Sequence, residues 1–197
     1  ALETVVYAVS QLEDDELFNA GIGSQIQSDG KIRMSASLMD GESQKMSGVI
    51  NIEEVKNPIQ VAQVLMQVDD RILGGSGATN FARKHGFESF STEIPQRRAE
   101  YEAKLASLGT GTVGCVALDK NGKIAVATST GGKGFEIPGR ISDSATVAGN
   151  YANEFCGVSL TGVGEDIVSN ATAAKIVTRV TDGFSIEKAF EKTFAEL

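Results

Sequence analysis

A short hairpin in the middle of the chain constrains the fold more than any other feature. Two apolar runs, Val113 to Leu118 and Ile124 to Ala127, flank the dipeptide Asn121-Gly122. Asn-Gly accepts positive φ at both central positions of a tight turn, so this dipeptide between β-prone runs predicts a β-hairpin. The two runs are therefore expected to be antiparallel neighbours in one sheet.

The register of this hairpin brings two threonines together. If Asn121 and Gly122 alone form the loop, counting back sets Val113 opposite Thr130. If the hairpin carries one bulged residue, Thr112 itself lies opposite Thr130. Both alternatives place two threonine side chains at the same end of the hairpin.

Thr112 directly follows Gly111, and this order suits an N-terminal threonine hydrolase. A threonine hydroxyl is a weak nucleophile, and a free α-amine on the same residue can serve as its base. That amine exists only after the Gly111–Thr112 peptide bond has been cut. The alternative is a hairpin with threonines at ordinary β-favoured positions, and these residues by themselves leave both interpretations open.

Composition points to one globular unit and excludes several classes of partner. The chain has 197 residues, of which 41% are hydrophobic, and a formal net charge of -8. We therefore expect one substantial core and no nucleic-acid partner. No apolar run approaches the length of a membrane span. We therefore expect no membrane partner. The two cysteines, Cys115 and Cys156, lie in apolar runs and indicate free thiols rather than a disulfide, so we expect a cytoplasmic protein.

Outside the central hairpin, alternation and turn residues predict a further antiparallel meander and one short strand. Asp29-Gly30 is expected to form the turn of a second hairpin, and Asp40-Gly41 ends its return strand. These strands are expected over residues 24–27, 31–38, 46–52 and 157–161. With helices before and after the strands, the pattern predicts an α+β fold of layered sheets covered by helices.

Helical spacing of apolar residues predicts five helices. They are expected over residues 2–12, 58–68, 78–86, 166–180 and 186–197. Asn57 is expected to cap the second helix and Ser185 the last. The polar segment 93–108 is expected to be a linker or a loosely held helix. The last helix is expected to turn its apolar residues inward, namely Ile186, Ala189, Phe190, Phe194 and Leu197.

A run of four acids, residues 13–16, precedes a turn that contains Gly21 and Gly23. One interpretation is a solvated helix end followed by a glycine turn. The other is a tight loop whose backbone carbonyls hold a hard cation, because such ions prefer oxygen ligands. Composition does not decide between the two.

The remaining parts of an acyl-transfer site also have candidates. Thr130 can hydrogen-bond to Thr112 and tune its reactivity. Thr161 and the backbone N–H of Gly162 stand at a glycine turn that opens a helix, where they can donate to an oxyanion.

Arg140 and Asp143 lie three residues apart after a glycine. Arginine pairs with a carboxylate in bidentate fashion and aspartate pairs with an ammonium, so the two side chains can hold both ends of an amino-acid head group. The alternative for this pair is a surface salt bridge.

These residues resemble a known family, the plant-type L-asparaginases and isoaspartyl peptidases of the N-terminal-nucleophile hydrolases. The resemblance covers nearly the whole chain, and the amino-acid sequence of residues 32–37 and 132–135 is most similar to that of cyanobacterial members. It is carried by Leu17-Phe18-Asn19-Ala20-Gly21, Leu38-Met39-Asp40-Gly41, Lys56-Asn57-Pro58, Gly111-Thr112-Val113-Gly114, Thr128-Ser129-Thr130-Gly131-Gly132, Gly139-Arg140, Tyr151-Ala152-Asn153 and Thr161-Gly162 with Gly164-Glu165.

The resemblance implies an αββα sandwich that is made as a precursor and cuts itself before Thr112. The single domain would then consist of an alpha part, residues 1–111 with a linker at about 93–111, and a beta part, residues 112–197. The two parts would stay together and pair into a dimer of heterodimers. The family begins with a strand carrying His-Gly-Gly-Ala-Gly and a helix, and this sequence lacks both.

The resemblance also implies roles for single residues. Thr112 would be the nucleophile with support from Thr130, and Thr161 and Gly162 would form the oxyanion hole. Asn19 is expected near the site. Arg140, Asp143 and Gly164 would bind the substrate. No cofactor is implied for catalysis, but a structural sodium ion would be held by backbone carbonyls of the acidic loop, which gives the candidate set Leu12, Glu13, Asp15, Phe18, Ala20 and Ile22.

The substrates implied are small molecules, namely β-aspartyl dipeptides and L-asparagine. Two alternatives remain at this stage. One is a hydrolase similar to glycosylasparaginase, which shares the nucleophile and must admit a glycan. The other is an uncleaved, non-catalytic binding or assembly protein.

Overall fold

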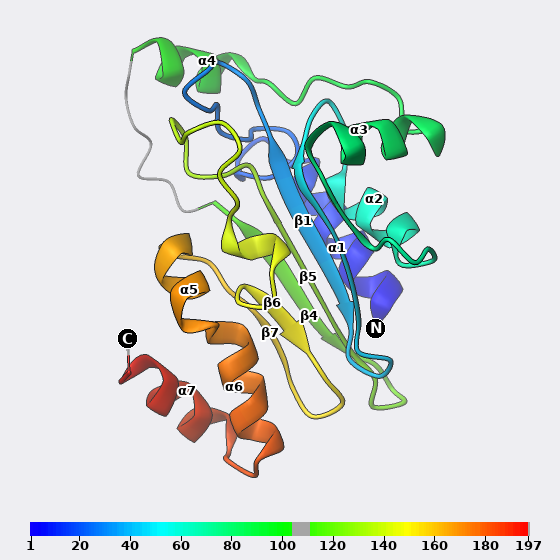
Figure 1. Cartoon of the computed structure of the whole chain (residues 1–197), viewed down its shortest axis with the longest axis vertical. Helices are drawn as coiled ribbons and strands as arrows, with labels where there is room; N and C mark the ends of the chain where they lie inside the picture. The colour runs from blue at the N-terminus through cyan, green and yellow to red at the C-terminus, as the bar shows by residue number, and fades with distance from the viewer. Residues whose placement is uncertain (104–110, 197) are drawn as a thin grey trace.

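The central element of the structure is a five-stranded sheet whose middle strands come from opposite halves of the chain. The structure is a computed structural model that describes residues 1–103 and 111–196. The strand order is β3-β2-β1-β5-β4 (Figure 1). Its strands are β1 (Met34–Asp40), β2 (Lys45–Ile52), β3 (Ile72–Gly74), β4 (Val113–Leu118) and β5 (Ile124–Thr130).

Most neighbours in this sheet run antiparallel, as the meander predicted. The central pair joins β1 to β5 with Ser35 opposite Thr130. One strand pair was not expected to be parallel: β3 runs parallel to β2 along Gly48 to Ile50. The sheet is therefore mixed, and the fold is α+β.

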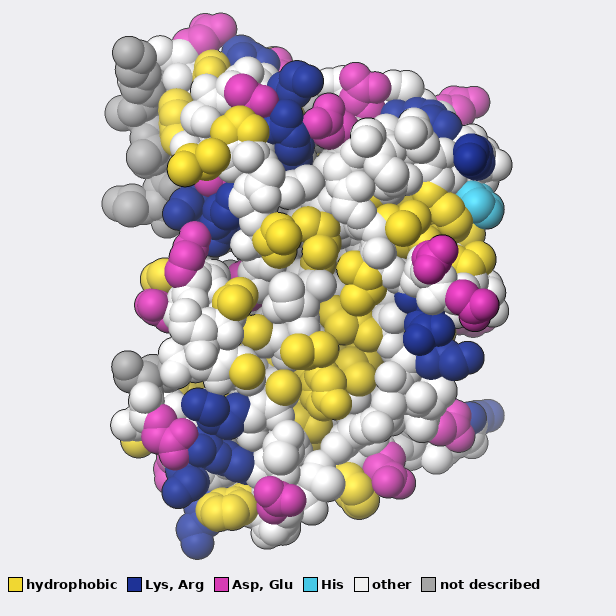
Figure 2. Space-filling view, viewed as in Figure 1, with side chains coloured by type: hydrophobic (Ala, Val, Ile, Leu, Met, Phe, Trp, Pro, Cys, Tyr) yellow, Lys and Arg dark blue, Asp and Glu magenta, His cyan; other side chains and the backbone are white. Residues whose placement is uncertain are grey.

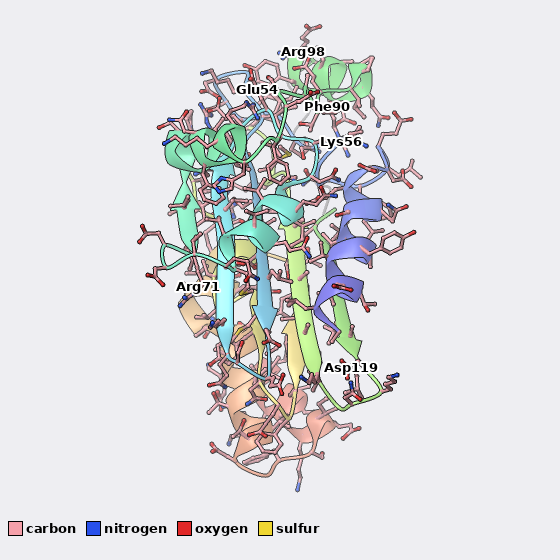
Figure 3. All side chains as sticks on the ribbon, turned by 90° about the vertical axis from the view of Figure 1, so that its right-hand side faces the viewer. Glu54, Lys56, Arg71, Phe90, Arg98 and Asp119 are labelled. Carbon is pink, nitrogen blue, oxygen red and sulfur yellow. The ribbon has the colours of Figure 1, made fainter. Side chains whose placement is uncertain are left out.

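Helices and a second, smaller sheet cover the two faces of the large sheet. Helices α1 (Leu2–Glu13) and α2 (Pro58–Leu65) pack against β1, β2, β4 and β5, and Figure 3 shows them side by side over the strands. The small antiparallel sheet of β6 (Asn150–Ala152) and β7 (Gly157–Ser159) contacts the large sheet as well. Helix α6 (Thr172–Thr181) packs on the small sheet, and α7 (Ile186–Phe194) packs on α6.

Three further helices and one 3-10 turn complete the described part of the chain. Helix α3 (Gly75–Lys84) contacts β2 and β3, and α5 (Gly164–Asn170) contacts α6. The short 3-10 turn η1 (Asp143–Ala145) lies against β1 and β5. The polar segment predicted to be a linker contains α4 (Pro95–Glu102), and its residues 104–110 lie outside the described residues. None of the helices in these described ranges is long and apolar enough to cross a membrane.

The main core lies between the large sheet and the helices α1 and α2. Its side chains are almost completely removed from solvent, which is the principal source of stability for such a layer. It includes Val5, Val9, Met34, Leu38, Val49, Ile52, Ile59, Leu65 and Ala127.

The central hairpin adopts the second of the two predicted registers. Val113 pairs with Ser129 and Leu118 with Ile124, so the ladder continues to Thr112 opposite Thr130. The loop is therefore longer than Asn121-Gly122 alone: the Asp119 N–H donates to the Lys123 carbonyl, and only Gly122 in this loop has a positive φ. The Asp119 carboxylate also accepts from the N–H groups of Asn121 and Lys123 and stabilises this longer loop. Figure 3 shows Asp119 at the tip of the hairpin.

Several predicted elements differ in detail. Residues 24–27 form no strand, because the Gln27 N–H bonds to Lys31 in a local turn and β1 begins only at Met34. Asn57 precedes α2 but its side chain makes no cap bond there, since its amide donates to Ser10 and Asp14. Ser185 does cap α7, with its hydroxyl accepting from the Lys188 N–H.

The last helix was predicted to bury its apolar face, and this was wrong. Ala189 is fully buried, but Ile186, Phe190 and Phe194 are each more than two fifths exposed. Leu197 lies outside the described residues. Apolar side chains also gather in the middle of the face shown in Figure 2.

Both cysteines are free, as expected.

The single helix predicted over 166–180 is broken into α5 and α6 at Ala171. This residue has a φ of +48° and a left-handed conformation. The Ala173 and Ala174 N–H groups, at the start of α6, bond to carbonyls of residues 147 and 148 instead of continuing the first helix. The break therefore turns α6 onto the small sheet.

The strain at this break is testable by a pair of glycine substitutions. An alanine in the left-handed region costs about 1 to 2 kcal/mol relative to its right-handed form, so Ala171→Gly is expected to stabilise the protein by roughly 0.5 to 1 kcal/mol. Ala174→Gly, inside α6, is expected to destabilise it by about 1 kcal/mol. Urea unfolding of both variants measures the difference, and two shifts of the same sign would contradict the left-handed assignment.

Candidate active site at the end of the central hairpin

Thr112 and Thr130 form a hydroxyl pair where the central hairpin ends. The Thr112 hydroxyl donates to Thr130 Oγ1 at 3.0 Å, and the Gly132 N–H donates to the same oxygen at 3.2 Å. Thr130 is buried and Thr112 is half-buried. The Thr112 oxygen therefore has one ordered partner, and its residue remains partly accessible to solvent.

Asn19 ties three segments of this region together. Its N–H donates to the Gly111 carbonyl oxygen at 2.9 Å, and its own carbonyl accepts from the Gly131 N–H at 2.8 Å. Its side-chain amide donates to the Gly132 carbonyl and accepts from the Gln25 N–H. A Cβ added to Gly111 would lie 2.6 Å from the Asn19 Cβ, so glycine is required for this approach. Asn19 therefore contacts the residues that directly precede Thr112 and directly follow Thr130.

Thr161 lines a pocket with Thr112. The pocket has a volume of about 240 Å³ between β4 and β7, and it is also lined by Gly114, Ser159 and Leu160. Gly162 follows Thr161 in an exposed turn before α5. The structure thus brings one of the two predicted oxyanion donors, Thr161, into the same pocket as Thr112.

Arg140, Asp143 and Gly164 lie next to one another. A Cβ on Gly164 would lie 2.7 Å from Arg140 Nη2 and 2.9 Å from Asp143 Oδ1, so this glycine allows both side chains to approach. Asp143 is buried, and its Oδ2 has no hydrogen-bond partner among the described residues. Burial raises the pKa of Asp143 above its usual range.

A simple salt bridge between Arg140 and Asp143 was the alternative to a binding site for a substrate head group. In the structure, Arg140 pairs with a different carboxylate. Its Nε and Nη2 donate to the two carboxylate oxygens of Glu165 at 2.8 and 3.1 Å. Lys133 approaches the same carboxylate at 3.3 Å. The bidentate bonds from Arg140 lower the pKa of Glu165 to about 2.

Two carboxylates near this site were not among the predicted site residues. Glu165 pairs with Arg140, and Glu136 is buried with its Oε2 lacking a partner among the described residues. A Cβ on Gly132 would overlap Glu136 Oε1, which places that carboxylate beside the glycines after Thr130. Glu13, for which the sequence left a solvated helix end and a cation-binding loop as alternatives, is fully buried, so its side chain does not belong to a solvated helix end. Burial raises the pKa of Glu13 to about 8.

The loop predicted to bind a cation is closed by its own backbone hydrogen bonds. The carbonyls of Leu12, Glu13 and Asp15 accept from N–H groups of the same loop, and a Cβ on Gly23 would lie 2.5 Å and 2.9 Å from the carbonyls of residues 16 and 18. Carbonyl oxygens are the type of ligand that a hard cation prefers. Across residues 1–103 and 111–196, the acidic loop included, no group of three or more His, Cys, Asp or Glu side chains is arranged to hold a metal.

An α+β fold with a hydrogen-bonded threonine pair at a hairpin end is the fold of a protein with a candidate threonine-based active site. Sequence comparison places the chain within one family. The profile of the family described as Asparaginase matches residues 1–106 and 94–197. The chain therefore belongs to the asparaginase family.

The curated relatives are similar over almost the whole of this chain. A Nostoc protein named isoaspartyl peptidase/L-asparaginase is 48% identical over 98% of the chain and 67% of the relative. A Synechocystis protein of the same name is 48% identical over 100% of the chain and 65% of the relative. A Pyrococcus furiosus protein named plant-type L-asparaginase is 37% identical over 97% of the chain and 70% of the relative. The chain spans about two thirds of the length of these relatives, and the predicted resemblance is confirmed.

The close packing beside Thr112 is testable without an activity assay. A Cβ on Gly114 would lie 2.0 Å from Ser159 Oγ, whereas Gly77 in α3 has nothing within 4 Å of that position. Gly114→Ala is expected to lower the free energy of unfolding by about 1 to 3 kcal/mol through overpacking, and Gly77→Ala to raise it by about 0.5 to 1 kcal/mol. Urea midpoints measure both effects. Equal midpoints for the two variants would contradict the contact between β4 and β7.

Proposed function

We propose that the protein is a self-processing amidohydrolase that cleaves β-aspartyl dipeptides and L-asparagine through Thr112. The observation that carries this proposal is the 3.0 Å hydrogen bond from Thr112 to Thr130, directly after Gly111. The family and the names of its relatives support the choice of reaction. The substrates are small molecules whose aspartyl end is recognised.

The first reaction is the cut between Gly111 and Thr112. The Thr112 hydroxyl oxygen attacks the Gly111 carbonyl carbon, the C–N bond breaks, and the nitrogen of Thr112 takes up a proton to become an amine. Water then hydrolyses the resulting ester and leaves a carboxylate on Gly111. The hydrogen bond from the Asn19 N–H to the Gly111 oxygen supports this step, because it stabilises negative charge that develops there.

The second reaction uses the amine that the cut has freed. The amine takes the Thr112 hydroxyl proton as the oxygen attacks the substrate amide, and the leaving amine receives a proton in turn. The Thr161 hydroxyl and the Gly162 N–H stabilise the oxyanion. Water then releases aspartate from the acyl-enzyme. The pocket that Thr112 shares with Thr161 supports this assignment.

Arg140 and Asp143 hold the substrate head group in this proposal. Arg140 binds the α-carboxylate, and Asp143 binds the α-amine beside Gly164. The support is electrostatic, because the buried Asp143 oxygen lacks a partner among the described residues and an ammonium supplies one. In this arrangement the substrate carboxylate replaces Glu165 on Arg140.

The proposal extends to the assembly. The fold is an αββα sandwich of the N-terminal-nucleophile hydrolases, supported by the order of helices and sheets described above. The parts 1–111 and 112–197 remain together and pair into a dimer of heterodimers. The two free cysteines are compatible with a cytoplasmic location.

Mass spectrometry under denaturing conditions tests the cut and the activity together. The purified chain is expected to give two fragments, residues 1–111 and 112–197, and to release aspartate from a β-aspartyl dipeptide. Thr112→Ala is expected to stay intact and inactive, because it lacks the nucleophile for both reactions. An intact parent chain after long incubation, or hydrolysis by Thr112→Ala at the parent rate, would refute the threonine mechanism.

We also propose that the acidic loop binds a structural sodium ion through the carbonyls of Leu12, Glu13, Asp15, Phe18, Ala20 and Ile22. The ion takes no part in the chemistry, and its role is to hold the loop that carries Asn19. The cluster of carbonyl oxygens around Gly21 and Gly23 supports this site.

Sodium binding is expected to raise thermal stability. At a sodium concentration 100 times the Kd, the gain is about 2.7 kcal/mol relative to choline chloride at equal ionic strength. Gly23→Ala is expected to abolish the gain, because its Cβ would intrude among the carbonyls. Gly30→Ala is the control, since Gly30 has a similar positive φ but its nearest neighbour is a tyrosine hydroxyl at 3.5 Å. Equal melting temperatures in sodium and choline would rule out the site.

A further inference from the structure

The buried carboxyl of Glu13 connects two elements that are distant in the sequence. Its Oε1 accepts from the Ser129 hydroxyl at 2.6 Å and from the Ile59 N–H at 3.1 Å. Ile59 lies in the first turn of α2, where no side chain of Asn57 caps the helix. One oxygen atom of Glu13 thus accepts from the N-terminus of α2 and from the end of β5.

Ser129 lies on the reverse face of the strand from the threonine pair. Successive side chains of a strand point to opposite faces, so Ser129 faces the helices while Thr128 and Thr130 face the small sheet. The contacts agree, because the Thr128 hydroxyl bonds to Asn150 and Ser159, of β6 and β7. The strand is therefore anchored on both faces immediately before Thr130.

We propose that Glu13 and Ser129 are positioning residues for the threonine site: their hydrogen bond fixes the end of β5, so that Thr130 remains oriented toward Thr112. This inference rests on the proposed function. It goes beyond that function because neither side chain touches Thr112 or the expected substrate groups. Thr130 is the last residue of β5, where strand hydrogen bonds end and an extra anchor restricts its motion most.

The geometry explains why a small displacement at Ser129 affects the reaction. Thr130 is covalently next to Ser129, and its oxygen accepts from both Thr112 and the Gly132 N–H. A shift of the backbone by a fraction of an ångström changes both of these distances. Catalytic groups that lose alignment by about 1 Å lose as much as 100-fold in rate.

The experiment compares Ser129→Ala with Ser47→Ala in the full chain. Ser47 is an equally buried serine on β2 whose hydroxyl donates to the Ala62 carbonyl of α2 at 2.6 Å. In each variant the acceptor keeps another donor, Ile59 N–H for Glu13 and Met66 N–H for Ala62. The two substitutions therefore remove the same group from the same kind of environment. They differ in their distance along the chain from Thr130.

Ser129→Ala is expected to lower kcat about tenfold with KM within about twofold of the parent, because the nucleophile is misaligned and the head-group contacts are retained. Ser47→Ala is expected to keep kcat within about twofold, although its urea midpoint falls by a similar amount. Glu13→Gln retains the acceptor oxygen and is expected to keep kcat within about threefold. An unchanged kcat in Ser129→Ala, or an equal loss in Ser47→Ala or Glu13→Gln, overturns the inference.

Amide hydrogen exchange of Gly132 separates this inference from the proposed function. Its N–H donates to Thr130 Oγ1, so exchange is expected to accelerate about tenfold in Ser129→Ala and to stay unchanged in Ser47→Ala. This readout requires no turnover. If the parent chain fails to hydrolyse β-aspartyl dipeptides, the proposed function fails and the exchange result alone decides the positioning role. Equal exchange in all three proteins overturns it.

Discussion

The antiparallel pairing of β1 with β5 is the interaction on which the rest of the structure depends. All seven residues of β5 are buried, and the strand has a neighbour on each side. A strand in this position must satisfy polar side chains on both faces, because unpaired polar groups are costly away from water. Here Ser129 bonds to Glu13 on one face, and Thr128 bonds to Asn150 on the other. The same requirement that stabilises the sheet therefore also fixes its last residue, Thr130.

The sequence predicted the parts of the site that depend on local pattern. The hairpin places Thr112 opposite Thr130, because pairing register follows from strand spacing once the loop is known. The loop length was left open since the Asn-Gly signal says nothing of Asp119, whose carboxylate stabilises the longer loop. Arg140 and Asp143 are close in sequence, and Gly164, which only the family resemblance added to them, lies beside both at the start of the next helix.

Contacts between distant segments escaped prediction. The sequence left Glu13 either at a solvated helix end or in a cation-binding loop, and its side-chain partner Ser129 lies 116 residues away. Glu165 approaches Arg140 across 25 residues, and no periodicity signals that pairing. The apolar face of α7 was predicted to be buried but is largely exposed. Helical spacing identifies an apolar stripe, but it does not show whether another element covers that stripe. The sequence pattern therefore predicts which face of an element is apolar or polar. Only the tertiary packing determines which other element, if any, contacts that face.

The pairing across the sheet also bears on what a cut after Gly111 would do to the fold. β1 lies before that bond and β5 after it, so a complete ladder of backbone hydrogen bonds joins the two parts. The hydrogen bond between Glu13 and Ser129 joins them again at the end of β5. A cut removes one covalent link but none of these contacts. The new amine of Thr112 would then be retained beside Thr130 by the same strands that positioned the bond before it was cut.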